Sequence, residues 1–169
     1  KRPCATTLYL YPASKSPLVL VLRRGPSKWW HFLLWNRDTG VITPGSWFNG
    51  MIYPHRCDLS PRGDCMVILA YRGAHDPVAW TALCDPPDVH AKVFWPQKNA
   101  RQGGGFFDDR LPVVWINLRG VESKVDVREP APVELGYLEN GQKPFGCIHD
   151  RFKRDGWRLC KEKSPQKES

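Results

Sequence analysis

Residues 60–71 read SPRGDCMVILAY, and this stretch decides the fold. Ser60 to Asp64 holds the Pro, Gly and Asp residues that favour a turn, and Cys65 to Tyr71 is an apolar run of strand length. A turn followed by a short apolar run indicates a strand that is buried inside a sheet. We therefore predict that residues 65–71 form the central strand of the protein.

Turns and short apolar runs alternate outward from this strand in both directions. Polar clusters such as Asn36 to Gly40 and Asp85 to Pro87 separate the runs. The other predicted strands are Thr7–Tyr11, Leu18–Arg24, Trp29–Trp35, Trp80–Cys84, His90–Trp95 and Pro112–Leu118. The chain has sixteen Pro and fourteen Gly, which argue against long helices. We expect only a short helical turn, within Ile148–Arg154.

This pattern predicts a mainly β protein, in which a meander forms a sandwich, an open barrel or small propeller-like sheets with short helical elements. The 169 residues fit one domain, which we place at residues 1–160, and the charged tail 161–169 is expected to be disordered. Residues 121–132 are predicted to be a loop or an edge strand. The predicted core consists of Leu20, Leu22, Leu34, Val67, Leu69, Trp80, Leu83, Val93, Phe94, Val114 and Ile116.

A longer block around the central strand carries a resemblance. The block is IYPHRCDLSPRGDCMVILAYRG at 52–73, followed by AWTALCDPP at 79–87, AKVFWPQ at 91–97, GGGFF at 103–107 and RDGWRL at 154–159. It resembles an uncharacterised family of bacterial proteins with a CDLSPxGD motif. The motif is also similar to the turn between two strands of a propeller blade, although Arg62 replaces the acidic residue of that turn. The resemblance implies a β-rich, soluble bacterial protein and supplies no catalytic residues.

The charge and the cysteines bear on partners and location. A net charge of +8 favours an acidic partner. The six Cys are widely and irregularly spaced and no Asn-x-Ser/Thr signal occurs, so we expect reduced, buried thiols and a cytoplasmic location. No run approaches the roughly 18 apolar residues of a membrane helix, so no membrane partner is expected.

Two segments interleave cations with aromatic rings, as in proteins that bind nucleic acid. Cations attract phosphates, and exposed rings stack on bases at about 1–3 kcal/mol each. Alternation along a strand also produces this pattern when Trp fills the core and Arg faces solvent, so both interpretations stay open. The candidate residues are Arg23, Arg24, Lys28, Trp29 and Trp30 in the first segment, and Arg151, Lys153, Arg154, Trp157 and Arg158 in the second.

Candidate chemistry is sparse. His55 and Cys57, together with Cys147 and His149, offer the two Cys and two His that zinc accepts. Buried thiols and surface histidines explain these pairs without a metal, so we expect no cofactor. His55, Asp58 and Cys57 are also the candidates for a catalytic site, but no established catalytic motif is present.

The leading hypothesis is therefore a non-catalytic binding or interaction module that engages a protein partner or complex. The alternatives are a nucleic-acid-binding protein that uses the basic and aromatic segments, and a hydrolase or nuclease that uses a His, Asp and Cys site.

Overall fold

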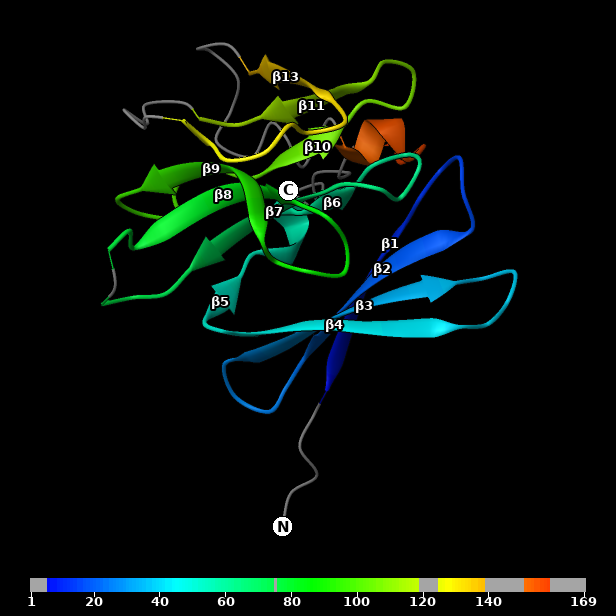
Figure 1. Ribbon diagram of the computed structural model, residues 1–169, viewed down its shortest axis with the longest axis horizontal. Coiled ribbons are helices and arrows are strands. Elements are labelled where there is room, and N and C mark those ends of the chain that lie inside the picture. The colour runs from blue at the N-terminus through cyan, green and yellow to red at the C-terminus, as the bar shows by residue number, and fades with distance from the viewer. Residues whose placement is uncertain (1–5, 75, 119–124, 139–150, 159–169) are drawn as a thin grey trace, which may run out of the picture.

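The protein is mainly β, as predicted, and consists of three open sheets and a short helix (Figure 1). The computed structural model describes residues 6–74, 76–118, 125–138 and 151–158. The predicted tail at 161–169 lies outside these residues.

The first sheet has four antiparallel strands in the order β1-β2-β3-β4. They are β1 (Thr7–Pro12), β2 (Leu18–Arg24), β3 (Trp29–Asn36) and β4 (Ile42–Asn49). The bounds of β2 match the prediction. Strand β4 was not predicted, because Pro44, Gly45 and Ser46 interrupt its apolar pattern. It forms through pairing with β3, whose register shifts between His31 and Leu33.

The second sheet has the order β12-β9-β8-β7-β5, and β6 also pairs with β7. Its strands are β5 (Met51–Ile52), β6 (Asp58–Leu59), β7 (Met66–Tyr71), β8 (Ala79–Cys84), β9 (Ala91–Gln97) and β12 (Asp126–Val127). A short 3-10 helix, η1 (Pro54–Arg56), lies between β5 and β6. Every residue of β7 except Tyr71 is buried, which confirms the predicted central strand.

The third sheet has the order β10-β11-β13, with an antiparallel and a parallel pair. Its strands are β10 (Gly105–Phe107), β11 (Val113–Ile116) and β13 (Glu134–Tyr137). Residues 151–154 form the helical turn, drawn in orange at this end of the molecule (Figure 1). Residues 148–150 of the predicted turn lie outside the described part.

Two hydrophobic clusters form the core, and β7 contributes to both. Successive side chains of a strand point to opposite faces. Met66 and Ile68 therefore lie in the cluster that includes the inner face of the four-stranded sheet, whereas Val67 lies in the cluster that includes β11. Most predicted core residues are buried, and the three that are only half-buried are Leu34, Trp80 and Phe94.

Candidate binding interface

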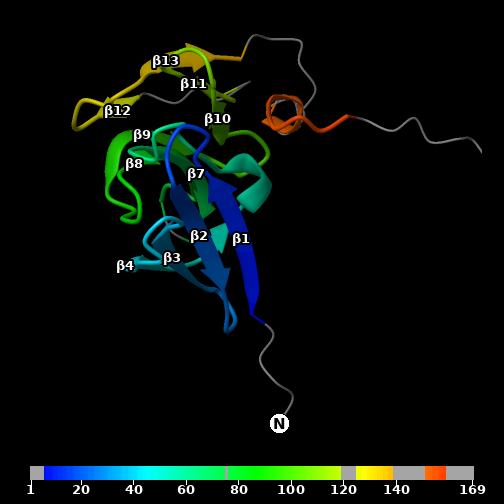
Figure 2. The same ribbon diagram turned by 90° about the vertical axis from the view of Figure 1, so that its right-hand side faces the viewer.

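The outer face of the four-stranded sheet is apolar, and it is not covered by a second layer in the part of the chain that the structure describes (Figure 2). The inner face packs Leu20, Leu22 and Phe32 into the core. The outer face leaves large apolar side chains 42–57% exposed, at Leu8, Leu10, Trp29, Ile42 and Trp47. A sheet that is apolar on both faces, with one face open to solvent, is typical of a binding surface.

Aromatic rings gather at one end of this face. Arg23, His31 and Trp47 form a row across β2, β3 and β4, because Arg23 pairs with His31 and His31 with Trp47. The His31 and Trp47 rings stack with centroids 4.1 Å apart, and the Arg23 guanidinium lies 5.9 Å from the Trp47 ring. Trp29 meets Trp47 edge to face at 6.4 Å. We call these four residues the aromatic shelf.

The shelf contains a hollow of about 390 Å³ lined by Pro26, Trp29 and Trp47. Trp29 and Trp47 are 42% and 50% exposed, so part of each ring is accessible to a ligand, while His31 covers one face of the Trp47 ring. Stacking against a flat ring is therefore the interaction that the hollow offers.

The imidazole of His31 is held in its neutral form. Partial burial, together with the adjacent Arg23 charge, lowers the pKa of His31 below its usual value of 6.5. At neutral pH the shelf therefore carries one positive charge, on Arg23.

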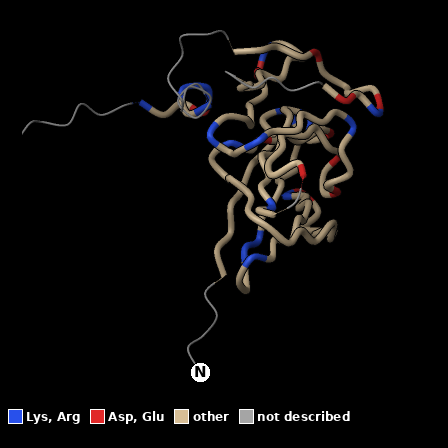
Figure 3. The backbone as a smooth tube through the Cα atoms, turned by 90° about the vertical axis from the view of Figure 1, so that its left-hand side faces the viewer, with Lys and Arg blue, Asp and Glu red and all other residues tan. Residues whose placement is uncertain are grey.

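The net positive charge of the protein lies in its N-terminal third, because acidic residues are scarce there. Residues 1–57 hold eight Lys and Arg and one acidic residue, Asp38, for a net charge of +7 out of the total of +8. The strands β1 to β4 contain no Asp or Glu. Figure 3 shows Lys and Arg at the turn between β2 and β3, without Asp or Glu beside them. The strands that carry the shelf thus contribute cations and no carboxylate of their own, although Asp88 accepts a hydrogen bond at 3.1 Å from Ser46, the neighbour of Trp47.

Within the first predicted segment, the structure separates the residues by strand alternation. Trp30 is 1% exposed, and its indole N–H donates to the Gly50 carbonyl at 3.2 Å, so it is a core residue and not a stacking surface. The Arg24 guanidinium lies 5.6 Å from the centroid of the Trp30 ring. Lys28 and Trp29 are exposed. Trp30 is therefore removed from the candidate site.

The second predicted segment uses its arginines inside the protein. Arg154 donates to both carboxylate oxygens of Asp58 and, at 2.7 Å, to the Phe107 carbonyl. Arg151 donates to the Cys57 carbonyl at 2.6 Å and lies over the Tyr11 ring. These two cations attach the short helix to the strands, so they are not available to phosphates.

Three residues of the second segment remain on the surface. Lys153, Trp157 and Arg158 are exposed, and Trp157 is 70% exposed. The Trp157 ring meets the ring of Phe152 edge to face. This pair of rings, at and just after a single helical turn, is not part of a sheet surface like the shelf.

The predicted catalytic residues are adjacent in the chain but differ in environment. His55 is exposed and contacts the edge of the Tyr9 ring. Cys57 is buried, and its thiol donates to the Tyr53 carbonyl. Asp58 is buried, accepts the Phe107 N–H at 2.9 Å and pairs with Arg154. Burial raises the pKa of Asp58, and Arg154 opposes this shift. The Asp58 carboxylate thus has a structural role.

The proposed zinc ligands are only partly described. Cys147 and His149 lie outside the described residues, and within the part of the chain that the structure describes no group of three or more potential metal ligands comes together. Cys57, Cys65 and Cys84 are buried, and burial raises the pKa of the Cys65 thiol to about 12. A thiol with such a high pKa is a poor nucleophile at neutral pH.

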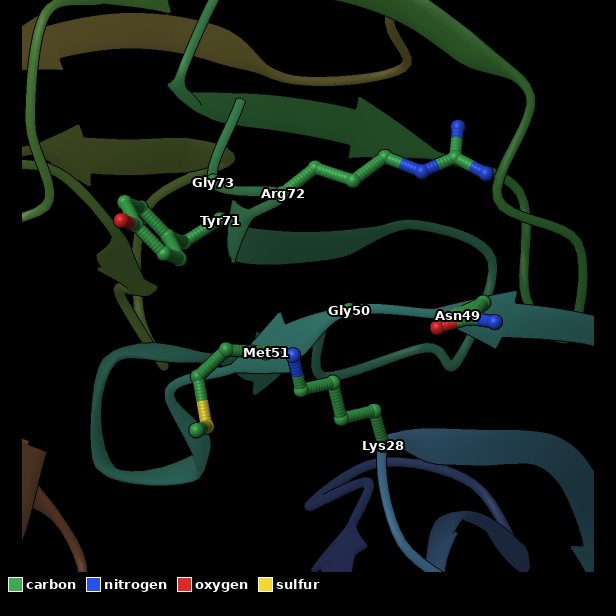
Figure 4. A pocket seen from close by; sticks show the side chains of 7 residues that line it. All are labelled: Lys28, Asn49, Gly50, Met51, Tyr71, Arg72 and Gly73. Carbon is green, nitrogen blue, oxygen red and sulfur yellow. The ribbon is translucent and has the colours of Figure 1, made fainter. Parts of the chain in front are cut away.

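A second pocket of about 470 Å³ borders the shelf. Lys28 lines it from just before β3 and Arg72 from just after β7, on different sides of the pocket and with their charged ends pointing in different directions (Figure 4). Lys28 precedes Trp29 in the chain, and Trp29 pairs with Asn49, which also lines the pocket. Sequence reasoning missed Trp47 and Arg72, because they are distant in the chain, and it missed His31, although His31 lies two residues after Trp29 on the same face of β3. The full lining is Lys28, Asn49, Gly50, Met51, Tyr71, Arg72 and Gly73.

No family model, no curated protein and no solved structure matches the chain. In the described residues, no helix has both the length and the apolar character needed to cross a bilayer.

Proposed function

We propose that the protein is a non-catalytic module that binds single-stranded nucleic acid on the aromatic shelf. The observation that carries this proposal is the exposed Trp29 and Trp47 pair beside Arg23, on a sheet whose strands contain no carboxylate. Bases stack on the exposed ring surfaces of Trp29 and Trp47, and Arg23 and Lys28 contact the backbone phosphates. Rings combined with a positive track are the means by which sheet surfaces bind single strands.

The geometry favours a single strand over a duplex. The hollow exposes ring surfaces for stacking, and the faces of bases are accessible only when they are unpaired. Stacking tolerates any base, because every base has a π face. We therefore expect weak sequence preference and strong salt dependence.

Fluorescence anisotropy with labelled single-stranded oligothymidylate and with a labelled duplex tests this proposal. We expect tighter binding of the single strand at low salt. Trp47→Ala should weaken binding by about 5- to 150-fold, since stacking contributes about 1–3 kcal/mol per base. Trp157→Ala is the matched control, because it removes an even more exposed indole (70% against 50% for Trp47) from the second segment, and it should leave the affinity unchanged.

Two results would contradict the proposal. One is the absence of single-strand binding at low salt, where phosphate contacts are strongest. The other is an equal loss of affinity in the Trp47→Ala and Trp157→Ala variants.

A second candidate function, docking of an acidic protein, is favoured by a different part of the same face. Leu8, Leu10 and Ile42 are 56–57% exposed, and stacking on bases does not need them. An apolar protein surface rimmed by carboxylates would complement these side chains and the charge of +8. This candidate replaces the first if two results are obtained together. Oligothymidylate fails to bind, and an acidic protein binds to the wild-type protein but not to a folded Leu10→Glu variant.

A further inference from the structure

We propose that the pocket lined by Lys28, Asn49 and Arg72 binds a phosphomonoester, the phosphate carried by the 5′ end of a nucleic-acid strand and by a free nucleotide. Binding of the 5′ phosphate of a nucleic-acid strand rests on the proposed function. Binding of the phosphate of a free nucleotide in the same pocket does not depend on it.

The charges of the lining favour a dianion. Two of the seven lining residues are cations, Lys28 and Arg72, and none is acidic. A phosphomonoester carries a charge of about −1.5 to −2 at neutral pH, whereas an internal phosphodiester carries −1. A site with two cations therefore discriminates in favour of the terminal phosphate.

Neither cation is engaged by a carboxylate. Within the described residues, no ion pair involves Lys28 or Arg72, although Asp76 lies nearby in the chain. Instead, the Arg72 guanidinium lies 5.9 Å from the centroid of the Phe48 ring, a contact that favours one orientation without neutralising the charge. An arginine so placed keeps its N–H groups for a phosphate, which it can bind through two parallel hydrogen bonds.

The position of the pocket suits the 5′ end of a bound nucleic-acid strand. Asn49 adds an amide donor at the end of β4, and its register partner Trp29 belongs to the shelf. Lys28 and Trp29 are adjacent in the chain, so the pocket and the rings lie at the same end of the sheet, although strand alternation directs neighbouring side chains to opposite faces. The volume of about 470 Å³ is large enough for a phosphate with its sugar.

The experiment compares four probes: inorganic phosphate, adenosine monophosphate, a single strand with a 5′ phosphate and the same strand with a 5′ hydroxyl. Anisotropy measures the strands, and isothermal titration calorimetry measures the small molecules. The 5′ phosphate should tighten strand binding roughly tenfold or more, as expected for charge-assisted hydrogen bonds. Arg72→Gln and Lys28→Gln should each reduce this difference. Lys98→Gln, which removes an exposed cation elsewhere, should preserve it.

The outcomes separate this inference from the proposed function. If both strands bind equally and Trp47→Ala weakens both, the pocket inference is overturned and the proposed function stands. If adenosine monophosphate binds through Arg72 but neither strand binds, the pocket is a nucleotide site and the proposed function fails. If none of the probes binds, both fail. Thermal unfolding of Arg72→Gln confirms that a lost preference does not reflect misfolding.

Discussion

The two basic and aromatic segments look alike in sequence but differ in what surrounds their cations. In the segment at 23–30, Arg23 and Lys28 lie in a region where the strands contain no carboxylate. In the segment at 151–158, Arg154 pairs with the buried Asp58 and Arg151 donates to a backbone carbonyl. The first segment therefore leaves its charge available to a ligand, whereas the second uses its charge to hold the fold together. Composition alone does not distinguish these roles, because the acceptors come from distant parts of the chain.

The largest expected effect is on stability, at Arg154. Arg154→Ala leaves the buried Asp58 carboxylate with only the Phe107 N–H as a donor among its described contacts. Removal of one partner from a buried ion pair costs about 3–5 kcal/mol. Urea denaturation should show this loss for Arg154→Ala, whereas Arg23→Gln should change the free energy of unfolding by less than about 0.5 kcal/mol.

A double variant sharpens this test. Asp58→Asn removes the buried charge, so combining it with Arg154→Ala should recover part of the stability lost in the single variant. Equal stability losses for Arg154→Ala and Arg23→Gln would remove the distinction between the two segments.

The next effect is on the salt dependence of single-strand binding. Each phosphate contact contributes about 0.7 to the slope of log affinity against log salt for single strands. Arg23→Gln should therefore reduce the magnitude of the slope by roughly 0.7. Lys153→Gln removes an exposed cation of the second segment and should leave the slope unchanged. A similar reduction of the slope in both variants would show that only the net charge of the protein matters, and not the position of Arg23.

The smallest effect concerns pH and His31. Its pKa lies below 6.5 in the free protein, and a bound phosphate would favour the protonated form. Affinity for a single strand should therefore rise as the pH falls below 6.5. His31→Phe keeps a ring against Trp47 and should flatten this rise, measured as the difference from wild type. A rise of the same size in His31→Phe would exclude His31 as its source.

Protonation of His31 has the opposite effect on stability: it favours binding of a single strand but disfavours the folded state. Because the folded protein lowers the pKa of His31, the unfolded chain takes up the proton first as the pH falls. The contribution of His31 to stability is therefore complete above 6.5 and is lost as the pH falls through the folded pKa. The binding measurements need a circular dichroism check of folding at each pH.

The sequence predicted the strands whose apolar runs are uninterrupted. The bounds of β2 and the buried position of β7 follow from local pattern alone. Strand β4 was missed because Pro44 and Gly45 have low strand propensity, and its pairing with β3 outweighs that propensity. The short strands β5 and β12 have two residues each, too few to show a period.

The candidate site was predicted only in part, for the same reason. Trp29, Arg23 and Lys28 were identified because they are close together in the chain. Trp47 and His31 meet only across β3 and β4, and Arg72 reaches the pocket from a different sheet. Trp30 was included wrongly, since the pattern WW does not show which of two adjacent rings faces the core.

The separation of charge along the chain gives the molecule a preferred orientation during approach. With +7 of the net charge in residues 1–57, the field of the protein is asymmetric, and a polyanion experiences a torque before any contact forms. The end of the four-stranded sheet that carries Arg23 and Lys28 therefore turns toward an approaching phosphate chain. Encounters in the productive orientation become more frequent, so the association rate falls with added salt more steeply than the dissociation rate changes.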